Sequence, residues 1–139
     1  MTHVERVQAT GHGNVTAQHT STYEVTTEDF LTEAGDCILG IEADRAPADF
    51  SAEFVEAAKS ETATITATLE AADTTVTITG RGDPRLTFEN EVSMVGRTSD
   101  YVDDRTIMVD ADKAAANLDR GIVSALAGGA DLTVTLRVE

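Results

Sequence analysis

The chain has 139 residues, which is room for one domain with a core of its own and too few for two domains of ordinary size. With 25 acidic against 10 basic residues its formal charge is −15, which disfavours binding to nucleic acid and to anionic membranes. Only 4% of the residues are aromatic and Cys37 is the single cysteine, so we expect an aliphatic core and exclude an internal disulfide or a cysteine-based zinc site.

The first half of the chain predicts four strands and one helix. Alternating polar and apolar residues, many of them β-branched, predict half-buried strands at residues 4–10, 15–25 and 62–69. The run from Cys37 to Ile41 is almost wholly apolar, which is typical of a central strand buried on both faces. Ser51 precedes an apolar pattern of helical spacing and is the expected N-cap of a helix near residues 52–59.

The second half predicts the same order of elements. Alternating strands are expected at residues 74–79, 85–95 and 132–138, and the short apolar run from Thr106 to Val109 predicts another central strand. Asp119 is the expected N-cap of a helix near residues 120–127, which ends at Gly128-Gly129.

The two halves also resemble each other in sequence, over residues of about 4–70 and 73–139. The matching runs are Gly11-His12-Gly13-Asn14 with Gly80-Arg81-Gly82-Asp83, Ile41 to Ala46 with Val109 to Ala114, and Ile65 to Glu70 with Val134 to Glu139. We therefore predict an internal duplication of two β-β-β-α-β halves about a pseudo-twofold axis, in a single domain over residues 1–139. The fold class is α+β and mostly β, with a barrel-like or strongly curled sheet and two short helices.

Several runs of the sequence resemble one known family across nearly the whole chain. They are Gly11 to Ala17, His19 to Thr22, Leu31-Thr32, Gly35 to Gly40 and Ala111 to Ala115. Together they resemble an archaeal family described as domain of unknown function 371. The resemblance implies an archaeal source, and it implies no activity because none is assigned to that family.

The distribution of charge predicts the surroundings of the protein. The acidic residues are spread along the whole chain, and Lys occurs only at positions 59 and 113. A strongly hydrated acidic surface with few lysines is typical of a protein kept in solution in molar salt, so we expect a halophilic cytoplasm. No apolar run has the length of a membrane span, and the N-terminal residues lack the layout of a signal peptide.

Two histidines are the candidate catalytic residues. His12 lies in a glycine-rich turn beside Asn14, where exposed amides and an imidazole could hold an anion or a substrate carboxylate. Alternatively, the glycines only provide the turn and Asn14 caps it. His19 falls on the apolar face of the strand expected at 15–25, at the position that Phe88 has in the other half. It is either a hydrogen-bonded core residue or part of a polar pocket between the halves.

Further ligand-binding candidates are charged. Asp44 and Asp112 occupy the same step in both halves, and each is followed by a cation, which is Lys113 in the second half. Two such carboxylates near a symmetry axis could share a proton or bind a divalent metal, or each could make an ordinary turn. Arg81 lies in the glycine-rich turn of the second half. The histidine spacing does not support a metal site, and Cys37 is expected to be an inert core residue.

The function that we favour is a small-ligand-binding protein or an enzyme, with a polar site at the seam between the two repeats. It would use His12, Asn14 and His19 from one half and Arg81 and Lys113 from the other, with His12 as the acid or base. The alternative is a non-catalytic module that assembles with itself or with another protein through exposed strand edges. Nucleic-acid binding ranks third, because the positive charges form no stripe. The sequence names no cofactor.

Overall fold

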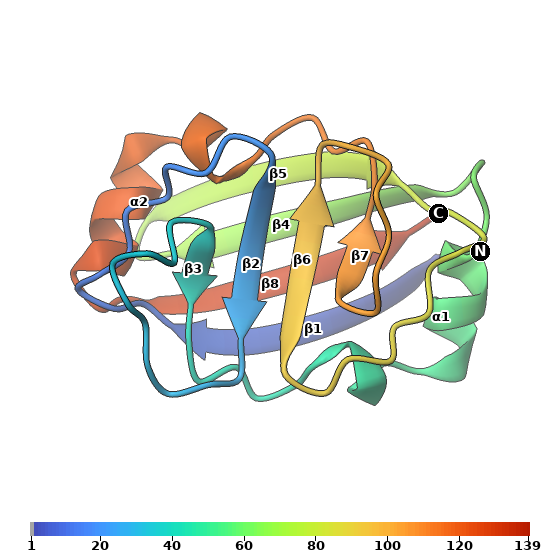
Figure 1. Ribbon diagram of the computed structural model, residues 1–139, viewed down its shortest axis with the longest axis horizontal. Helices are drawn as coiled ribbons and strands as arrows, with labels where there is room; N and C mark the ends of the chain where they lie inside the picture. Colours follow the sequence, from blue (N-terminus) through green and yellow to red (C-terminus); the bar gives the residue numbers. More distant parts are fainter. Residues whose placement is uncertain (1) are drawn as a thin grey trace.

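The computed structural model describes residues 2–139, and it has an α+β fold that is mostly β, with two α-helices, as predicted (Figure 1). The elements in chain order are β1 (His3–Thr10), β2 (Thr22–Thr26), β3 (Ile38–Gly40), α1 (Ala52–Ala58), β4 (Thr64–Ala71), β5 (Thr74–Arg81), β6 (Ser93–Arg97), β7 (Thr106–Met108), α2 (Arg120–Ala127) and β8 (Asp131–Val138). A short 3-10 turn precedes each α-helix, at Pro47–Asp49 and at Ala115–Asn117.

The strands form two separate sheets, so the predicted barrel or single curled sheet is wrong. Sheet A has the order β1-β8-β4-β5 and is antiparallel throughout, and sheet B has the order β3-β2-β6-β7. The sheets touch at two corners through single bridges, Thr10 with Ile41 and Arg81 with Val109. The residue after each bridge, Glu42 or Asp110, has a positive φ, which turns the chain away before a second pair can form.

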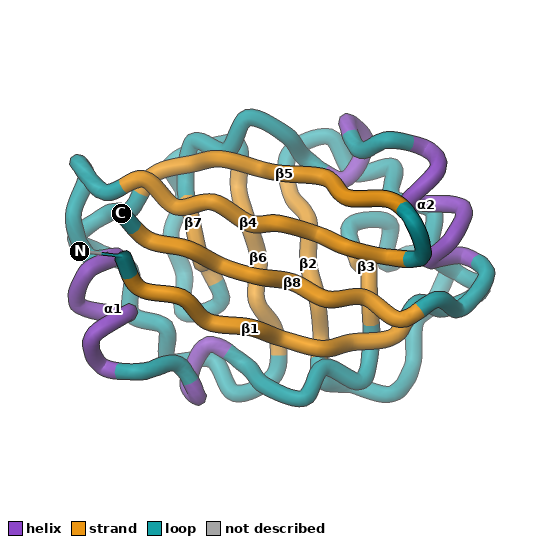
Figure 2. The backbone as a smooth tube through the Cα atoms, turned by 180° about the vertical axis from the view of Figure 1, so that it is seen from behind, coloured by secondary structure: helices purple, strands orange, loops and turns teal. Residues whose placement is uncertain are grey.

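The sheets pack face to face, with their strands crossing at a steep angle (Figures 1 and 2). Along β4 and β8 every second residue is buried, and this alternation gives sheet A one apolar face against sheet B and one threonine-rich outer face. Figure 2 shows that no helix covers the outer face, because α1 and α2 lie at opposite ends of the molecule. Within the described residues, neither helix has the length and apolar character needed to cross a membrane.

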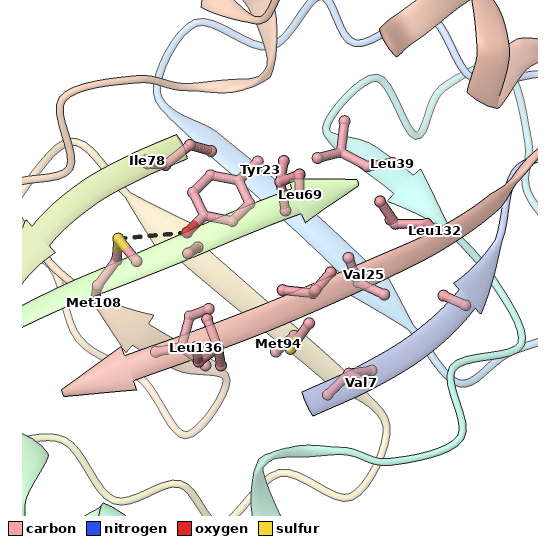
Figure 3. Close-up of a cluster of buried hydrophobic side chains, with 14 of the residues drawn as sticks. Val7, Tyr23, Val25, Leu39, Leu69, Ile78, Met94, Met108, Leu132 and Leu136 are labelled. Atoms are coloured by element: carbon pink, nitrogen blue, oxygen red, sulfur yellow. Dashed lines mark hydrogen bonds between the residues drawn. The ribbon is translucent and has the colours of Figure 1, made fainter. Parts of the chain in front are cut away.

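The core between the sheets is mainly aliphatic, as the composition predicts (Figure 3). Tyr23 is a buried exception, and its hydroxyl donates to Sδ of Met108 at 3.3 Å. Burial raises the pKa of this phenol, so the hydroxyl stays protonated. The other aromatic side chains of the core, Phe50, Phe54 and Phe88, pack edge to face or tilted around α1.

The predicted N-caps are confirmed, and they fix where both helices begin. Oγ of Ser51 accepts a hydrogen bond from the Phe54 amide at 3.1 Å, and Oδ1 of Asp119 accepts one from the Gly121 amide at 2.7 Å. The helices span Ala52–Ala58 and Arg120–Ala127, within one residue of the predicted ranges.

Two predictions about the strands of sheet B are wrong. The strands predicted at 15–25 and 85–95 begin only at Thr22 and Ser93, because Ala17 and Phe88 have φ of 49° and 54° and interrupt the extended chain. The apolar runs at 37–41 and 106–109 form β3 and β7, which are edge strands rather than central ones. They are buried because the corner bridges bring sheet A against their outer edges.

Each element of the first half has a counterpart in the second with the same pairing. Exchanging β1, β2, β3 and β4 with β5, β6, β7 and β8 reproduces both sheet orders. The geometry matches Gly11 with Gly82, not with Gly80 as the sequence suggests. A Cβ on Gly11 would collide with the carbonyl of Leu126 in α2, and one on Gly82 would collide with that of Ala58 in α1. Each glycine is needed because a strand leaves its sheet against the end of a helix.

Candidate functional site

A polar pocket of about 300 Å³ lies at the corner where β1 ends and β8 begins. We call it the corner pocket; its lining residues are Gln8, Ala9, Thr10, Glu42, Asp44 and Asp131. The bridge between Thr10 and Ile41 holds its loop against β1, with amide-to-carbonyl distances of 2.9 and 2.7 Å. The pocket therefore combines residues from the first half of the chain with one from the second.

The carboxylates of the corner pocket have no cationic partner. Among residues 2–139, Glu42, Asp44 and Asp131 form no salt bridge, and all three are solvent-exposed. Oδ1 of Asp44 accepts a hydrogen bond from the Gln8 amide at 2.9 Å, which leaves its second oxygen unused by the strand. The Gln8 side-chain oxygen accepts from the Thr133 hydroxyl at 2.8 Å, so the NH₂ group of Gln8 is the end that is left to donate.

The second half has a corresponding corner, and there the carboxylates are paired. Arg81 corresponds to Thr10, and Asp110 and Asp112 correspond to Glu42 and Asp44. Nε of Arg81 donates to Oδ2 of Asp110 at 2.6 Å, and its Nη1 donates to the Gly82 carbonyl at 2.9 Å. We call this arrangement the second corner.

The charges of the second corner are further balanced by neighbouring arginines. Side-chain and backbone hydrogen bonds from Arg85 lower the pKa of Asp83 to about 2, and Arg81 lies 3.4 Å from the same carboxylate. The hydrogen bond with Asp110 raises the pKa of the Arg81 guanidinium. Arg81 and Asp83 therefore stay charged at any ordinary pH.

Asp44 and Asp112 act alike but do not meet. Each accepts from a backbone amide of an outer strand of sheet A, Gln8 of β1 or Thr79 of β5, and returns its own amide to the same residue. Because β1 and β5 are opposite edges of sheet A, the two carboxylates lie far from any common axis. Lys113 lies 3.7 Å from Asp112 and donates to the Thr77 carbonyl of β5 at 2.9 Å.

These contacts also cover the strand edges through which self-assembly was predicted. Arg45 corresponds to Lys113 and donates to the Arg6 carbonyl of β1 at 3.0 Å. On each outer strand, one backbone amide and two carbonyls are thus hydrogen-bonded. Their partners are Asp44 and Arg45 on β1, and Asp112 and Lys113 on β5. Such capping is a common means of keeping edge strands from pairing with another chain.

The two histidines and Asn14 stabilise turns. Nδ1 of His12 accepts from the Asn14 amide at 3.0 Å, and the Asn14 side chain donates to the Leu31 carbonyl at 2.8 Å. Nδ1 of His19 accepts from the amides of Ser21 and Thr22 at 3.2 and 3.1 Å. With Nδ1 accepting, the neutral rings carry their proton on Nε2.

The residue of the second half that corresponds to His19 is not the one that the sequence predicted. In the second half, Oδ1 of Asn90 accepts from the amides of Val92 and Ser93 at 2.9 and 2.7 Å, so His19 corresponds to Asn90 and not to Phe88. Both side chains close the turn that leads into a strand of sheet B.

Of the six lining residues of the corner pocket, sequence reasoning found Asp44 and missed the other five, which are Gln8, Ala9, Thr10, Glu42 and Asp131. Glu42 could have been found, because it stands in the repeated run that begins at Ile41. Thr10 and Asp131 become neighbours only because β1 pairs with β8, and the sequence of neither strand indicates this pairing.

A second depression and the single cysteine are weaker candidates for a functional site. A shallow depression of about 490 Å³ lies beside α1, lined by His3, Ala52, Glu53, Glu56 and Ala57. Burial and the nearby Glu24 raise the pKa of the Cys37 thiol to about 11, which agrees with the predicted inert role. Within the described residues, no three His, Cys, Asp or Glu side chains are grouped so as to hold a metal ion.

Comparison with known proteins identifies the family. Residues 7–139 match the family described as Domain of unknown function (DUF371). An uncharacterized protein of Methanocaldococcus jannaschii is 40% identical over 126 residues, which cover 91% of this chain and 93% of that protein. The match extends through both halves and includes every residue of the corner pocket. The chain therefore belongs to the family of this domain of unknown function, as its glycine-rich runs indicated.

Proposed function

We propose that the protein binds a small polar molecule in the corner pocket. The observation that carries this proposal is the contrast between the two corners. Asp110 and Asp112 are each paired with a cation of the protein, whereas Glu42, Asp44 and Asp131 line the corner pocket and form no salt bridge within residues 2–139. Unneutralised acceptors gathered in a pocket favour a ligand that brings hydrogen-bond donors. Both imidazoles already serve turns, so the proposal is binding and does not include a catalytic step.

The site lies at the seam between two halves that we infer to have arisen by duplication. The matching strand order supports this inference, and so does the sequence read in the structural register. Thr27-Glu28-Asp29-Phe30-Leu31 follows β2, and Thr98-Ser99-Asp100-Tyr101-Val102 follows β6. Phe30 and Tyr101 in these runs are both exposed. Duplication followed by divergence would leave one corner filled and the other open.

We further propose that the protein works in a cytoplasm of high salt. The charge of −15 and the exposure of most acidic side chains support this setting. In molar salt the Debye length is about 3 Å, so the net charge would neither attract nor repel a ligand from a distance. Recognition would then depend on direct contacts inside the pocket.

Self-association is a second candidate function, favoured by the depression beside α1. Its lining includes the apolar side chains of Ala52 and Ala57. The occupant that we propose is a second copy of the chain. Sedimentation velocity in molar KCl, with Ala57→Glu as the variant, would give a single monomer species for both proteins if this candidate is wrong.

The binding function is tested by a thermal-shift screen in molar KCl with compounds of varied polarity. A ligand at a hundred times its Kd adds about 2.7 kcal/mol to the free energy of unfolding, which raises the Tm by roughly 5–10 °C for a domain of this size. The screen is repeated with Glu42→Gln and with Glu61→Gln, an exposed control in the turn before β4. Binding in the corner pocket predicts that Glu42→Gln reduces the shift and that Glu61→Gln does not. If no compound moves the Tm, the proposal fails.

A further inference from the structure

Two connections of equal length lead from sheet A to sheet B, residues 11–21 between β1 and β2 and residues 82–92 between β5 and β6. We call them the first and the second connection. Their backbone hydrogen bonds correspond. The amides of His19 and Asn90 each donate to the carbonyl of an aspartate before an edge strand, and the carbonyls of both residues accept from the 3-10 turn before a helix. The two connections therefore differ in their side chains and not in their path.

Two imidazole nitrogens hold the turns of the first connection. Nδ1 of His12 accepts a hydrogen bond from the Asn14 amide at 3.0 Å. Nδ1 of His19 accepts from the amides of Ser21 and Thr22 at 3.2 and 3.1 Å. Both rings are half-buried, so they can exchange protons with water. Because a protonated imidazole has a donor at each nitrogen, protonation removes the acceptor of all three amides.

The second connection has oxygen acceptors in the same two places. Oδ1 of Asp83 accepts from the Arg85 amide at 2.8 Å, and Oδ1 of Asn90 accepts from the amides of the two residues that begin β6. Side-chain and backbone hydrogen bonds from Arg85 hold the pKa of Asp83 at about 2, and the amide group of Asn90 gains no proton in this range. The second connection therefore keeps its acceptors at every pH at which a histidine titrates.

No acidic side chain bonds to either imidazole of the first connection. Among residues 2–139, His12 and His19 form no salt bridge. The charged residues in the segments that continue the first connection or bond to it are Glu24 of β2, Glu33 and Asp36 before β3, Arg97 of β6, Arg120 of α2 and Asp131 of β8. In molar KCl, charges that are not in contact with a ring are screened within about 3 Å. The effect of protonation then comes mainly from the lost acceptors.

We propose that the first connection is a pH-sensitive segment, which opens in mild acid while the second connection stays closed. A histidine side chain ordinarily takes up a proton near about pH 6.5. The turns of the first connection are stable while the imidazoles are neutral, and they lose stability as the pH falls through this range. Opening exposes Val15 and Ala17, which are buried in the core. The bond from Arg120 to the Ala17 carbonyl at 3.2 Å limits the opening to a local one.

The experiment is amide hydrogen exchange of ¹⁵N-labelled protein in molar KCl, at about pH 7.5 and at about pH 5.5. Each exchange rate is divided by the intrinsic rate at the same pH to give a protection factor. An imidazole that gains its proton only in the open state raises the opening constant by up to about tenfold over this range. The protection factors of Ser21 and Thr22 should therefore fall by about three- to tenfold, and those of Val92 and Ser93 should stay within about twofold.

Two substitutions exchange the acceptors of the connections and make the test specific. His19→Asn gives the first connection the acceptor of the second, so the protection of Ser21 and Thr22 should no longer depend on pH. Asn90→His is the converse, and it should make the amides at the start of β6 lose protection in acid. His3, which lies beside α1, is unchanged in both variants and controls for the titration of other histidines. The dispersion of each spectrum shows directly whether the variant is folded.

Three results would overturn the proposal. They are a fall of less than about threefold at Ser21 and Thr22, an equal fall in both connections, and a fall that persists in His19→Asn. If Asn90→His does not fold, the comparison of the wild type with His19→Asn decides the question alone. None of these outcomes depends on whether the corner pocket binds a ligand.

Discussion

Glu5 allows a direct test of the structure, because it is an acidic side chain that is buried and hydrogen-bonded. Its residue is 7% exposed. One carboxylate oxygen accepts from Nη2 of Arg45, and the other accepts from the backbone amide of Ser51, the N-cap of α1, at 2.9 Å. Glu5 thereby joins β1 to the start of α1. We predict that Glu5→Gln, which keeps the shape and removes the charge, lowers the stability of the fold substantially.

The magnitude follows from the two hydrogen bonds. A hydrogen bond to a charged group contributes about 1.5–3 kcal/mol, and a neutral one about 0.5–1.5 kcal/mol. The amide oxygen of Gln can still accept from Ser51, so about 1 kcal/mol is lost there. Its NH₂ group would face the Arg45 guanidinium, donor against donor, so the second bond is lost entirely. The sum is about 2–4 kcal/mol, reduced somewhat because Arg45 keeps its bonds to the Arg6 and Asp49 carbonyls.

Urea denaturation in molar KCl measures this loss, since guanidinium chloride would change the ionic strength. Glu61→Gln, in the exposed turn before β4, is the matched control and should stay within about 0.5 kcal/mol of the wild type. A Glu5→Gln variant as stable as this control would refute the description of Glu5 as a bonded, buried carboxylate.

The same residue predicts a dependence on pH. Burial raises the pKa of Glu5, but the hydrogen bonds from Ser51 and Arg45 outweigh it and the net pKa is lowered. A lowered folded-state pKa means that the stabilisation is present above the unfolded value, about 4.3, and is lost as the pH falls through the folded value. The wild type should therefore lose more stability than Glu5→Gln between about pH 5 and pH 3.

Other predictions concern the turns, the glycines and the thiol. His19→Asn should leave the urea midpoint nearly unchanged because Asn90 makes the same turn, whereas His19→Phe should lower the stability by about 1–2 kcal/mol by removing the acceptor of two amides. Gly82→Ala should prevent stable folding, seen as a lost cooperative urea transition, because its Cβ would overlap the Ala58 carbonyl. Cys37 should react with a thiol reagent at pH 8 far more slowly than in urea-unfolded protein, because its pKa is about 11.

Much of the fold was predictable because its signals are local. The N-caps Ser51 and Asp119 identify both helices, and the alternation of residues 132–138 identifies the last strand, since each depends only on neighbours in sequence. The failures are non-local. Residues 15–21 alternate like a strand and bury Val15 and Ala17, yet the positive φ at Ala17 removes them from the ladder. The alternation of polar and apolar residues therefore indicates which side chains are buried, but it does not indicate which segments pair in a sheet.

The candidate site was harder to predict for the same reason. Arg81, Asp112 and Asp44 were chosen from the repeat, and they do lie at the two corners. The histidines were chosen for their chemistry, but an imidazole nitrogen that accepts two amides is a substitute for an asparagine oxygen. The pocket itself depends on Asp131 meeting β1, which only the sheet order reveals.

The inferred duplication allows the corner pocket to be compared with the second corner of the same chain. The two corners have the same bridge and the same strand-bonded carboxylate, and they differ in charge at two positions. Thr10 stands where the second corner has Arg81, and Asp131, which pairs with Thr10, stands where the second corner has Thr64, which pairs with Arg81. The second corner is closed by hydrogen bonds within the chain, so it needs nothing from solution. The corner pocket is lined by three carboxylates, Glu42, Asp44 and Asp131, and none of them forms a salt bridge within residues 2–139. Duplication followed by divergence would produce this contrast if one corner is neutralised by Arg81 and the other by a ligand that the protein binds, and the thermal-shift screen tests that proposal.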